Sequence, residues 1–176
     1  MNIALIGSGR MGRMLESLCE KDEGLHVAGF VGRTGYASLA DMEQVDAALD
    51  FSYPGNLESL LACAVAKKIP LVIGTTGLSE EQGEAIRKAS REIPIVWADN
   101  FSTGVTVLCR LARLAAQSLG DDFDIEIVET HHRMKEDAPS GTAKQLLAYM
   151  DPKHEHEIVY GREGHPGKRG HEIGVH

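Results

Sequence analysis

The sequence predicts an α/β protein in which a parallel sheet with covering helices comes first and a smaller domain follows. Two observations predict this fold class. Over residues 1–100, short apolar runs alternate with segments of helical periodicity, and such repetition builds a parallel sheet with helices on both faces. After residue 100 the pattern changes to one long amphipathic helix and then a polar, histidine-rich segment. We therefore expect two domains, covering residues 1–102 and 103–176.

The elements of the first domain follow from its apolar pattern. Five runs have the length of buried strands, namely Ile3–Ile6, Leu25–Val31, Ala47–Asp50, Leu71–Ile73 and Ile95–Ala98. Helical spacing recurs in three segments between them, Met11–Cys19, Asn56–Ala66 and Ser79–Arg91. The segment Arg33–Gln44 is short and weakly periodic, so we expect a loop there instead of a full helix.

The second domain begins with an apolar stripe that predicts a helix over Val105–Leu119. Polar and apolar residues then alternate over Asp124–Glu129, which predicts a half-buried strand. Pro139 marks the start of a further helix over Ser140–Met150. We expect a weak strand at Glu157–Tyr160 and another one from Glu172.

Composition narrows the function classes. The chain has 176 residues, is 43% hydrophobic and carries a formal charge of −8, so nucleic acid is not an expected partner. No apolar run reaches the roughly 18–20 residues of a membrane span. An export signal would begin with a charged stretch followed by an apolar one, whereas this N-terminus begins with a predicted strand. The cysteines Cys19, Cys63 and Cys109 are far apart, which predicts reduced core thiols in a cytoplasmic protein.

A glycine-rich turn follows the first strand. Gly7-Ser-Gly-Arg-Met-Gly12 matches G-x-G-x-x-G at Gly7, Gly9 and Gly12. In a Rossmann-type sheet these glycines make the tight turn, let the backbone approach a pyrophosphate and let the helix pack on the strand. We expect dinucleotide binding here; the alternative is a tight strand-to-helix turn without a ligand.

Other strand ends supply further cofactor candidates. The second strand ends without the acid that usually binds the ribose of NADH, and Arg33 instead offers a guanidinium to a 2′-phosphate. This favours NADPH over NADH, unless Arg33 is a solvated surface residue. The loops Asp50-Phe-Ser-Tyr-Pro-Gly55 and Gly74-Thr-Thr-Gly77 also follow strands, where α/β sheets bind ligands, although Gly-Thr-Thr-Gly is also ordinary turn chemistry.

The segment between the last two predicted helices carries the candidate chemistry. His131 and His132 follow a strand, and Lys135 lies three residues further on; histidine is the usual proton-transfer group near neutral pH. Ser140, Gly141 and Thr142 place hydroxyls and free N–H groups at a helix start, which suits a carboxylate or phosphate. The alternatives are a solvated strand end and a simple N-cap at Ser140.

We expect no metal site. The chain has eight histidines, but the H-E-x-x-H pattern and the ordered spacing of a catalytic zinc site are absent from the sequence. The best alternative is His-x-His at His154 and His156.

Taken together, five motifs resemble the dihydrodipicolinate reductase family, also called 4-hydroxy-tetrahydrodipicolinate reductase, of the diaminopimelate route to lysine. They occur in order as Gly7–Gly12, Asp50-Phe-Ser, Gly74-Thr-Thr-Gly, Asn100-Phe-Ser-Thr-Gly-Val105 and Glu129-Thr-His-His-Arg-Met-Lys-Glu-Asp-Ala-Pro-Ser-Gly-Thr-Ala143. The resemblance covers the chain from residue 1 to its end, and the last motif is the most specific.

The resemblance implies a Rossmann domain and an α+β substrate domain whose open sheet forms a homotetramer. It implies NADPH or NADH as cofactor and a small cyclic imine dicarboxylate as substrate. By motif position, His131 is the general acid or base and Lys135 the proton donor, while His132, Ser140, Gly141 and Thr142 contact the substrate. The cofactor residues would be Gly7, Ser8, Gly9, Arg10, Met11, Gly12, Arg33, Phe51, Ser52, Gly74, Thr75, Thr76, Asp99, Asn100 and Phe101.

The sequence departs from the family pattern in three places. Gly32 stands where members often carry an acid, and Asp99 replaces a common proline before Asn100. Members normally continue beyond the segment that Arg162-Glu-Gly-His-Pro-Gly-Lys-Arg169 resembles, so we expect the chain to be incomplete at its C-terminus. The rival functions are a non-catalytic NADPH-sensing module and another Rossmann reductase acting on a small dicarboxylate.

Overall fold

The structure is a computed structural model that describes residues 1–33, 35–135 and 137–176. Its contacts divide the chain into two compact units, Met1–Asp99 and Asn100–His176. Within the described residues, no helix has the length and apolar character needed to cross a membrane.

The first unit is built on a five-stranded sheet with the order β2-β1-β3-β4-β5, and every neighbouring pair is parallel. Its strands are β1 (Asn2–Ile6), β2 (His26–Val31), β3 (Ala47–Asp50), β4 (Leu71–Ile73) and β5 (Ile95–Trp97). Its helices are α1 (Arg10–Cys19), α2 (Leu57–Lys67) and α3 (Glu80–Ala89). The predicted parallel sheet is therefore confirmed, with element ends that differ by one or two residues.

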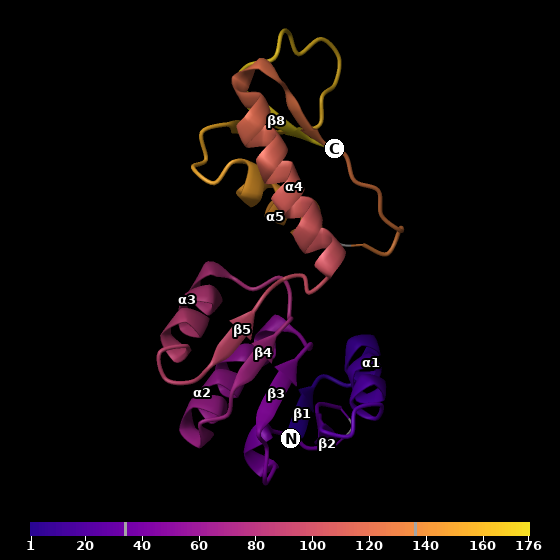
Figure 1. Cartoon of the computed structure of the whole chain (residues 1–176), viewed down its shortest axis with the longest axis vertical. Coiled ribbons are helices and arrows are strands. Elements are labelled where there is room, and N and C mark those ends of the chain that lie inside the picture. Colours follow the sequence, from indigo (N-terminus) through magenta and orange to yellow (C-terminus); the bar gives the residue numbers. More distant parts are fainter. Residues whose placement is uncertain (34, 136) are drawn as a thin grey trace. The chain divides into compact units, whose positions relative to one another are not determined.

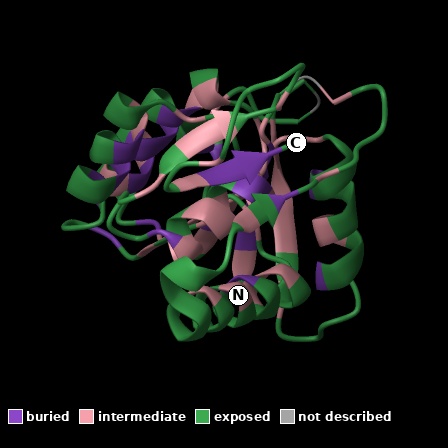
Figure 2. Cartoon of the chain, turned by 90° about the horizontal axis from the view of Figure 1, so that it is seen from above, coloured by how far each residue is buried: buried purple, intermediate pink, exposed green. Residues whose placement is uncertain are grey.

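The strand order places the helices on opposite faces of this sheet. Strand β2 lies on one side of β1 in the sheet, whereas β3, β4 and β5 follow one another on the other side. Because such crossovers are right-handed, α1 covers one face while α2 and α3 cover the other (Figure 1). The larger core lies under α2 and α3 and contains Ile6, Leu60 and Ile73. Figure 2 colours buried residues purple, and they occur on both strands and helices.

The crossover from β2 to β3 contains only a 3-10 turn, η1 (Leu39–Asp41), so the expected loop is confirmed for its described residues, all but residue 34. Ser38 and Asp41 form a capping box around this turn. The ammonium of Lys67 on α2 donates to the carbonyl oxygens of Ala40 and Met42 at 2.6 and 2.9 Å. These contacts tie the loop to the sheet's covering helix.

The second unit has a three-stranded parallel sheet with the order β6-β8-β7. Its elements are α4 (Thr103–Leu119), η3 (Gly120–Asp122), β6 (Ile125–Ile127), α5 (Gly141–Met150), β7 (Glu157–Tyr160) and β8 (Glu172–Val175). Helix α4 packs against α5, and side chains of α5 close a small core over Ile127 and Val175. The predicted small domain with an open sheet is confirmed.

Two element ends of this unit differ from expectation for local reasons. Helix α4 begins at Thr103, because Ser102 caps it by accepting from the N–H of Val105 at 3.4 Å. Strand β6 ends at Ile127, where we expected Glu129. The N–H of Glu129 still donates to the carbonyl oxygen of His176 at 2.9 Å, but the Glu129 side chain turns away to bind the segment before α5.

Candidate active site

The glycine turn after β1 has the backbone that its sequence pattern predicts. Gly7 has φ +98°, and a Cβ there would lie 2.7 Å from the carbonyl oxygen of Phe51. A Cβ on Gly12 would lie 2.0 Å from the carbonyl oxygen of Gly7. Side chains are therefore excluded at both positions. This close approach holds the start of α1 against β1.

The N-terminus of α1 is open to an anion. Its N-cap is Gly9, which offers no side chain to the free N–H groups, and the first turn contains no acidic residue. Arg10 and Met11 stand in that turn and are exposed, and space is open around Gly9 within 4 Å. Free N–H groups and the positive end of the helix dipole suit a pyrophosphate. The expected cofactor loop thus fits a dinucleotide.

The ends of β3 and β4 are joined by a buried carboxylate. Asp50 is 1% exposed, and it accepts from the hydroxyls of Ser52 at 2.5 Å and Thr75 at 2.9 Å. The Thr75 hydroxyl in turn accepts from the N–H of Ser52 at 3.0 Å. Burial raises the pKa of Asp50 above its ordinary value, against these hydrogen bonds. The Ser52 and Thr75 side chains therefore hold the two loops together, which leaves their backbone to meet a ligand.

The remaining candidates of this unit lie around the same strand ends. Phe51 is half-buried against Gly74, where a Cβ would lie 2.2 Å from the ring, while Thr76 and Asp99 are exposed. Arg33 is exposed after β2. A cavity of about 200 Å³ opens at the ends of β1 and β2, and Gly32 and Ser38 are among its lining residues. Space of this kind beside the glycine turn suits the nucleoside part of a dinucleotide.

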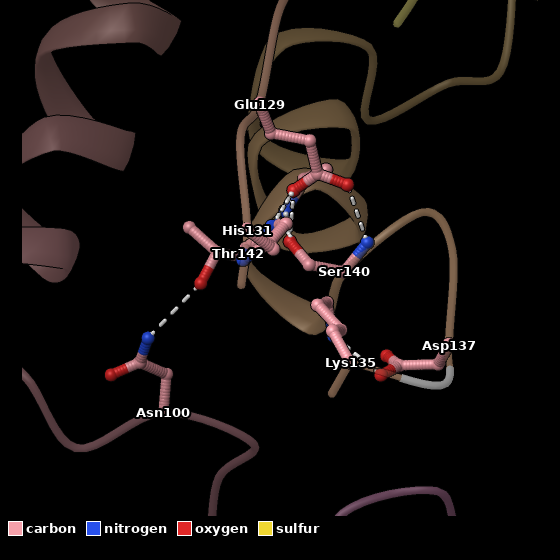
Figure 3. A network of polar contacts seen from close by, with 8 residues as sticks. Asn100, Glu129, His131, Lys135, Asp137, Ser140 and Thr142 are labelled. Carbon is pink, nitrogen blue, oxygen red and sulfur yellow. Dashed lines mark hydrogen bonds and ion pairs between the residues drawn. The ribbon is translucent and has the colours of Figure 1, made fainter. Parts of the chain in front are cut away.

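The second unit centres on Glu129, whose carboxylate joins the end of β6 to the start of α5 (Figure 3). One oxygen lies 2.9 Å from Nε2 of His131 and also accepts from the Ser140 hydroxyl. The other oxygen accepts from the N–H of Ser140 at 2.8 Å. Hydrogen bonds from His131 and then Ser140 lower the pKa of Glu129 to about 2. An ionised carboxylate therefore orients both the imidazole and the helix start.

Ser140 is buried, and its hydroxyl makes two hydrogen bonds. Its hydroxyl donates to Glu129, and it caps α5 by accepting from the N–H of Ala143 at 3.1 Å. Gly141 and Thr142 follow as the first two helical residues, whose N–H groups an α-helix leaves without internal partners. The N–H groups of Gly141 and Thr142 thus stand at the helix start where we expect an anion to bind, and the buried Ser140 side chain caps that start from within.

Asn100 joins this second cluster. Its amide nitrogen donates to the Thr142 hydroxyl at 3.2 Å, as Figure 3 shows, and its amide oxygen accepts from the N–H of Ser102 at 2.8 Å. Asn100 and the exposed Phe101 belong to the second unit, and their expected place beside the cofactor stays a prediction. The Asn100 side chain therefore positions the residue at the start of α5.

The loop between Glu129 and Ser140 holds the other polar candidates. His132 accepts through Nδ1 from the N–H of Met134 at 3.2 Å. The carbonyl oxygen of His132 accepts from the N–H of Lys135 at 3.1 Å. The side chain of Lys135 is half-buried and its ammonium pairs with Asp137, and this contact lowers the pKa of Asp137. A charged amine and an oriented imidazole thus lie on one loop.

A cavity of about 410 Å³ opens at the carboxyl ends of the small sheet, and Glu129, Pro139, Tyr160 and Val175 are among its lining residues. Glu129 and Asp50 are the two residues of the site that the sequence reasoning did not single out. Both are acidic residues of the motifs, at or just after the end of a strand. The motifs do not show which residues, distant in sequence, donate hydrogen bonds to them.

Comparisons with known proteins agree with this architecture. Residues 1–101 match the family model "Dihydrodipicolinate reductase, N-terminus" and residues 104–176 match "Dihydrodipicolinate reductase, C-terminus". A 4-hydroxy-tetrahydrodipicolinate reductase of Pseudoalteromonas atlantica is 41% identical over 95% of this chain and 73% of its own length. One of Akkermansia muciniphila is 44% identical over 96% of this chain and 70% of its own length.

A solved structure shares the fold. It is a dipicolinate-bound dihydrodipicolinate reductase from Paenisporosarcina sp. TG-14, with a TM-score of 0.69 and 22% sequence identity over 99% of this chain and 77% of that one. Both halves of the family are thus matched in order along one chain. The chain therefore belongs to the dihydrodipicolinate reductase family.

Proposed function

We propose that this chain reduces 4-hydroxy-tetrahydrodipicolinate to tetrahydrodipicolinate in the diaminopimelate route to lysine. The first unit would bind NADPH or NADH, and the second would bind the cyclic imine dicarboxylate. The observation that carries the proposal is the Glu129 carboxylate, which orients His131 and the start of α5 together. A proton-transfer group and an anion-binding helix start are thereby built into one network.

The first unit supplies the cofactor site in this proposal. The open N-terminus of α1 would bind the pyrophosphate, and the loops held by Asp50 would border the nicotinamide. The reduced nicotinamide supplies a hydride when it is bound. We assign NADPH as the preferred form, because Arg33 follows β2 and Gly32 stands where an acid would repel a 2′-phosphate.

The second unit supplies the proton and the carboxylate site. Hydride addition to a conjugated imine moves electron density onto the ring, so a proton must reach a neighbouring carbon. Lys135 or His131 would deliver it, with Glu129 holding the imidazole of His131 in place. The N–H groups of Gly141 and Thr142 would bind one substrate carboxylate, and His132 would contact the ring substituents.

We further propose that the chain acts in the cytoplasm as a homotetramer. The support is its family membership.

The test is the absorbance of the reduced nicotinamide after addition of freshly generated substrate, with each cofactor in turn. We expect turnover by the wild-type chain and a fall in kcat of roughly 10²–10⁴-fold in Lys135→Ala and His131→Ala. The matched controls are Lys153→Ala and His165→Ala, which change exposed residues of the same unit, and both should keep wild-type turnover.

Two outcomes would contradict the proposal. Nucleotide binding without oxidation would point to a sensing module. Near-normal turnover of both active-site variants would remove the proton-transfer roles of His131 and Lys135.

A further inference from the structure

A second group of chemically capable side chains lies at the amino ends of the small sheet's strands. Asp121 is in η3 before β6, His156 directly precedes β7 and His171 directly precedes β8. Because the strands are parallel, these three positions meet at one edge. The residues of the candidate active site follow the opposite, carboxyl ends of the strands.

The three side chains lie within reach of one another. One ligand atom from each lies within 4.8 Å of the other two, and Nε2 of His171 is 3.5 Å from a carboxylate oxygen of Asp121. The rings of His156 and His171 stack with centroids 4.0 Å apart and an angle of 16° between their planes. Two imidazoles and one carboxylate thus converge from three separate segments of the chain.

The far side of each imidazole faces an oxygen atom. Nδ1 of His156 is 3.4 Å from Asp151, a carboxylate that is 5% exposed and accepts from the N–H groups of Glu155 and His156 at 2.9 and 3.0 Å. Nδ1 of His171 is 3.2 Å from the carbonyl oxygen of Glu155. Metal-binding histidines usually place one ring nitrogen on an oxygen and use the other as the ligand. Nδ1 of His171 has such a contact, whereas Nδ1 of His156 faces the Asp151 carboxylate without a hydrogen bond among the described residues.

The electrostatic surroundings favour a cation. The cluster lies beside the C-terminus of α4, which ends at Leu119 directly before η3, and the negative end of a helix dipole stabilises positive charge. Asp121, Asp151 and Glu155 add carboxylates, and the neighbouring basic side chains of Lys153 and Arg169 already pair with Glu155 at 3.7 Å and Glu126 at 2.6 Å.

We propose that Asp121, His156 and His171 form a three-ligand site for a divalent transition-metal ion such as Zn²⁺, Co²⁺ or Ni²⁺. Two imidazole nitrogens and one carboxylate oxygen are ligands that these ions accept, with further positions left for water. The site would link the starts of all three strands and stabilise the second unit. It has no part in the reductase chemistry proposed above, so each proposal can be tested independently of the other.

Chelation requires a small adjustment of the side chains. Lone pairs of stacked imidazoles run parallel, so one ring must turn for both nitrogens to point at one ion. His156 has 20% of its side chain exposed and is held by Asp151, whereas the side chains of His171 and Asp121 are 51% and 83% exposed. The two exposed side chains therefore have room to turn onto an ion that the less exposed His156 also binds.

The experiment is a Co²⁺ titration of the whole chain, followed by visible absorbance and by calorimetry, with Zn²⁺ as competitor. We expect one Co²⁺ per chain, and at least about tenfold weaker binding in His171→Ala and in Asp121→Asn. Zn²⁺ should raise the Tm of the wild-type chain and not that of His171→Ala, because an ion that binds only the native state stabilises it. Circular dichroism verifies that His171→Ala and Asp121→Asn are folded.

The control variants are His165→Ala and His154→Ala, which change exposed histidines outside the cluster, and both should keep wild-type affinity. Absence of stoichiometric Co²⁺ binding would overturn the proposal. So would equal affinity in His171→Ala and the wild type, or a loss of affinity confined to His154→Ala, which would assign the ion to the His-x-His pair.

Discussion

Replacing Glu129 by glutamine tests how the candidate site is held together. The carboxylate accepts two hydrogen bonds from Ser140 and one contact from His131. A glutamine keeps the shape of the side chain, but only one of its two terminal atoms is an oxygen acceptor. The NH₂ group that replaces the second oxygen would face a donor from Ser140 or His131. At least one charge-assisted hydrogen bond is therefore lost, and His131 loses the carboxylate that orients its imidazole.

The expected effect is on turnover. A hydrogen bond to a charged group contributes about 1.5–3 kcal/mol. If that contribution supports the oriented imidazole in the transition state, kcat should fall by about 10- to 150-fold, since each 1.36 kcal/mol is a factor of ten. The KM for the substrate should change less, because the N–H groups of Gly141 and Thr142 remain. Steady-state kinetics with reduced nicotinamide and freshly generated substrate measure both quantities.

The chain offers a matched control for this variant. Glu126 also lies 2.9 Å from a histidine Nε2, that of His176, and pairs with Arg169 at 2.6 Å, but it stands on β6 and is not part of the motif loop. Glu126→Gln should leave kcat within about twofold of wild type, well below the cost of a charged hydrogen bond. Equal turnover of Glu129→Gln and the wild type, with both proteins folded, would refute the reasoning.

Further predictions concern stability and cofactor choice. Ser140→Ala should lower the free energy of unfolding by about 1 kcal/mol, as loss of an N-cap does, and should also reduce kcat. The control Ser79→Ala, which removes the cap of α3, should lower stability without changing kcat. Equal turnover of the two variants would contradict the support role of Ser140. Asp50→Ala should lower the free energy of unfolding in urea by about 1–3 kcal/mol for each hydroxyl left without its acceptor; an unchanged transition would contradict that role. The pKa of Glu129 is lowered to about 2, so its contribution to stability is present above its ordinary pKa of about 4.3 and is lost as the pH falls from there toward 2. The unfolding curves of wild type and Glu129→Gln should therefore converge on acidification, and a constant difference would argue against the shift. Arg33→Asp should weaken NADPH binding by calorimetry and leave NADH binding unchanged; unchanged NADPH affinity would show that Arg33 makes no phosphate contact.

Local signals were sufficient for most of the fold. The alternating apolar runs and helical stripes predicted all five strands of the first sheet, because each element buries one face and its period shows in the sequence. The weak periodicity of Arg33–Gln44 correctly predicted a loop for the residues of that segment that the structure describes. The start of α5 was predicted from Pro139 and Ser140, and Ser140 caps it. The end of β6 was placed too late, because alternation continues to Glu129 although the ladder with β8 ends at Ile127.

The site was less predictable than the fold, because its contacts join residues far apart in sequence. Glu129 is eleven residues before Ser140, and as the polar end of an alternating strand it has the pattern of a solvated residue. Asp50 and Thr75 are 25 residues apart, and only the parallel pairing of β3 with β4 brings them together. The His156–His171 pair depends in the same way on the alignment of β7 with β8. A sequence shows which groups are present, and the sheet register determines which of them meet.

The most direct test of the reductase account is a crystal structure of this chain with NADPH and a planar pyridine dicarboxylate. The account predicts that C4 of the nicotinamide lies about 3–3.5 Å from a ring carbon of the dicarboxylate. It also predicts that Lys135 or His131 lies within about 2.6–3.2 Å of the ligand, directly or through one water. A complex in which the dicarboxylate binds elsewhere, with both side chains directed into bulk solvent, would contradict it.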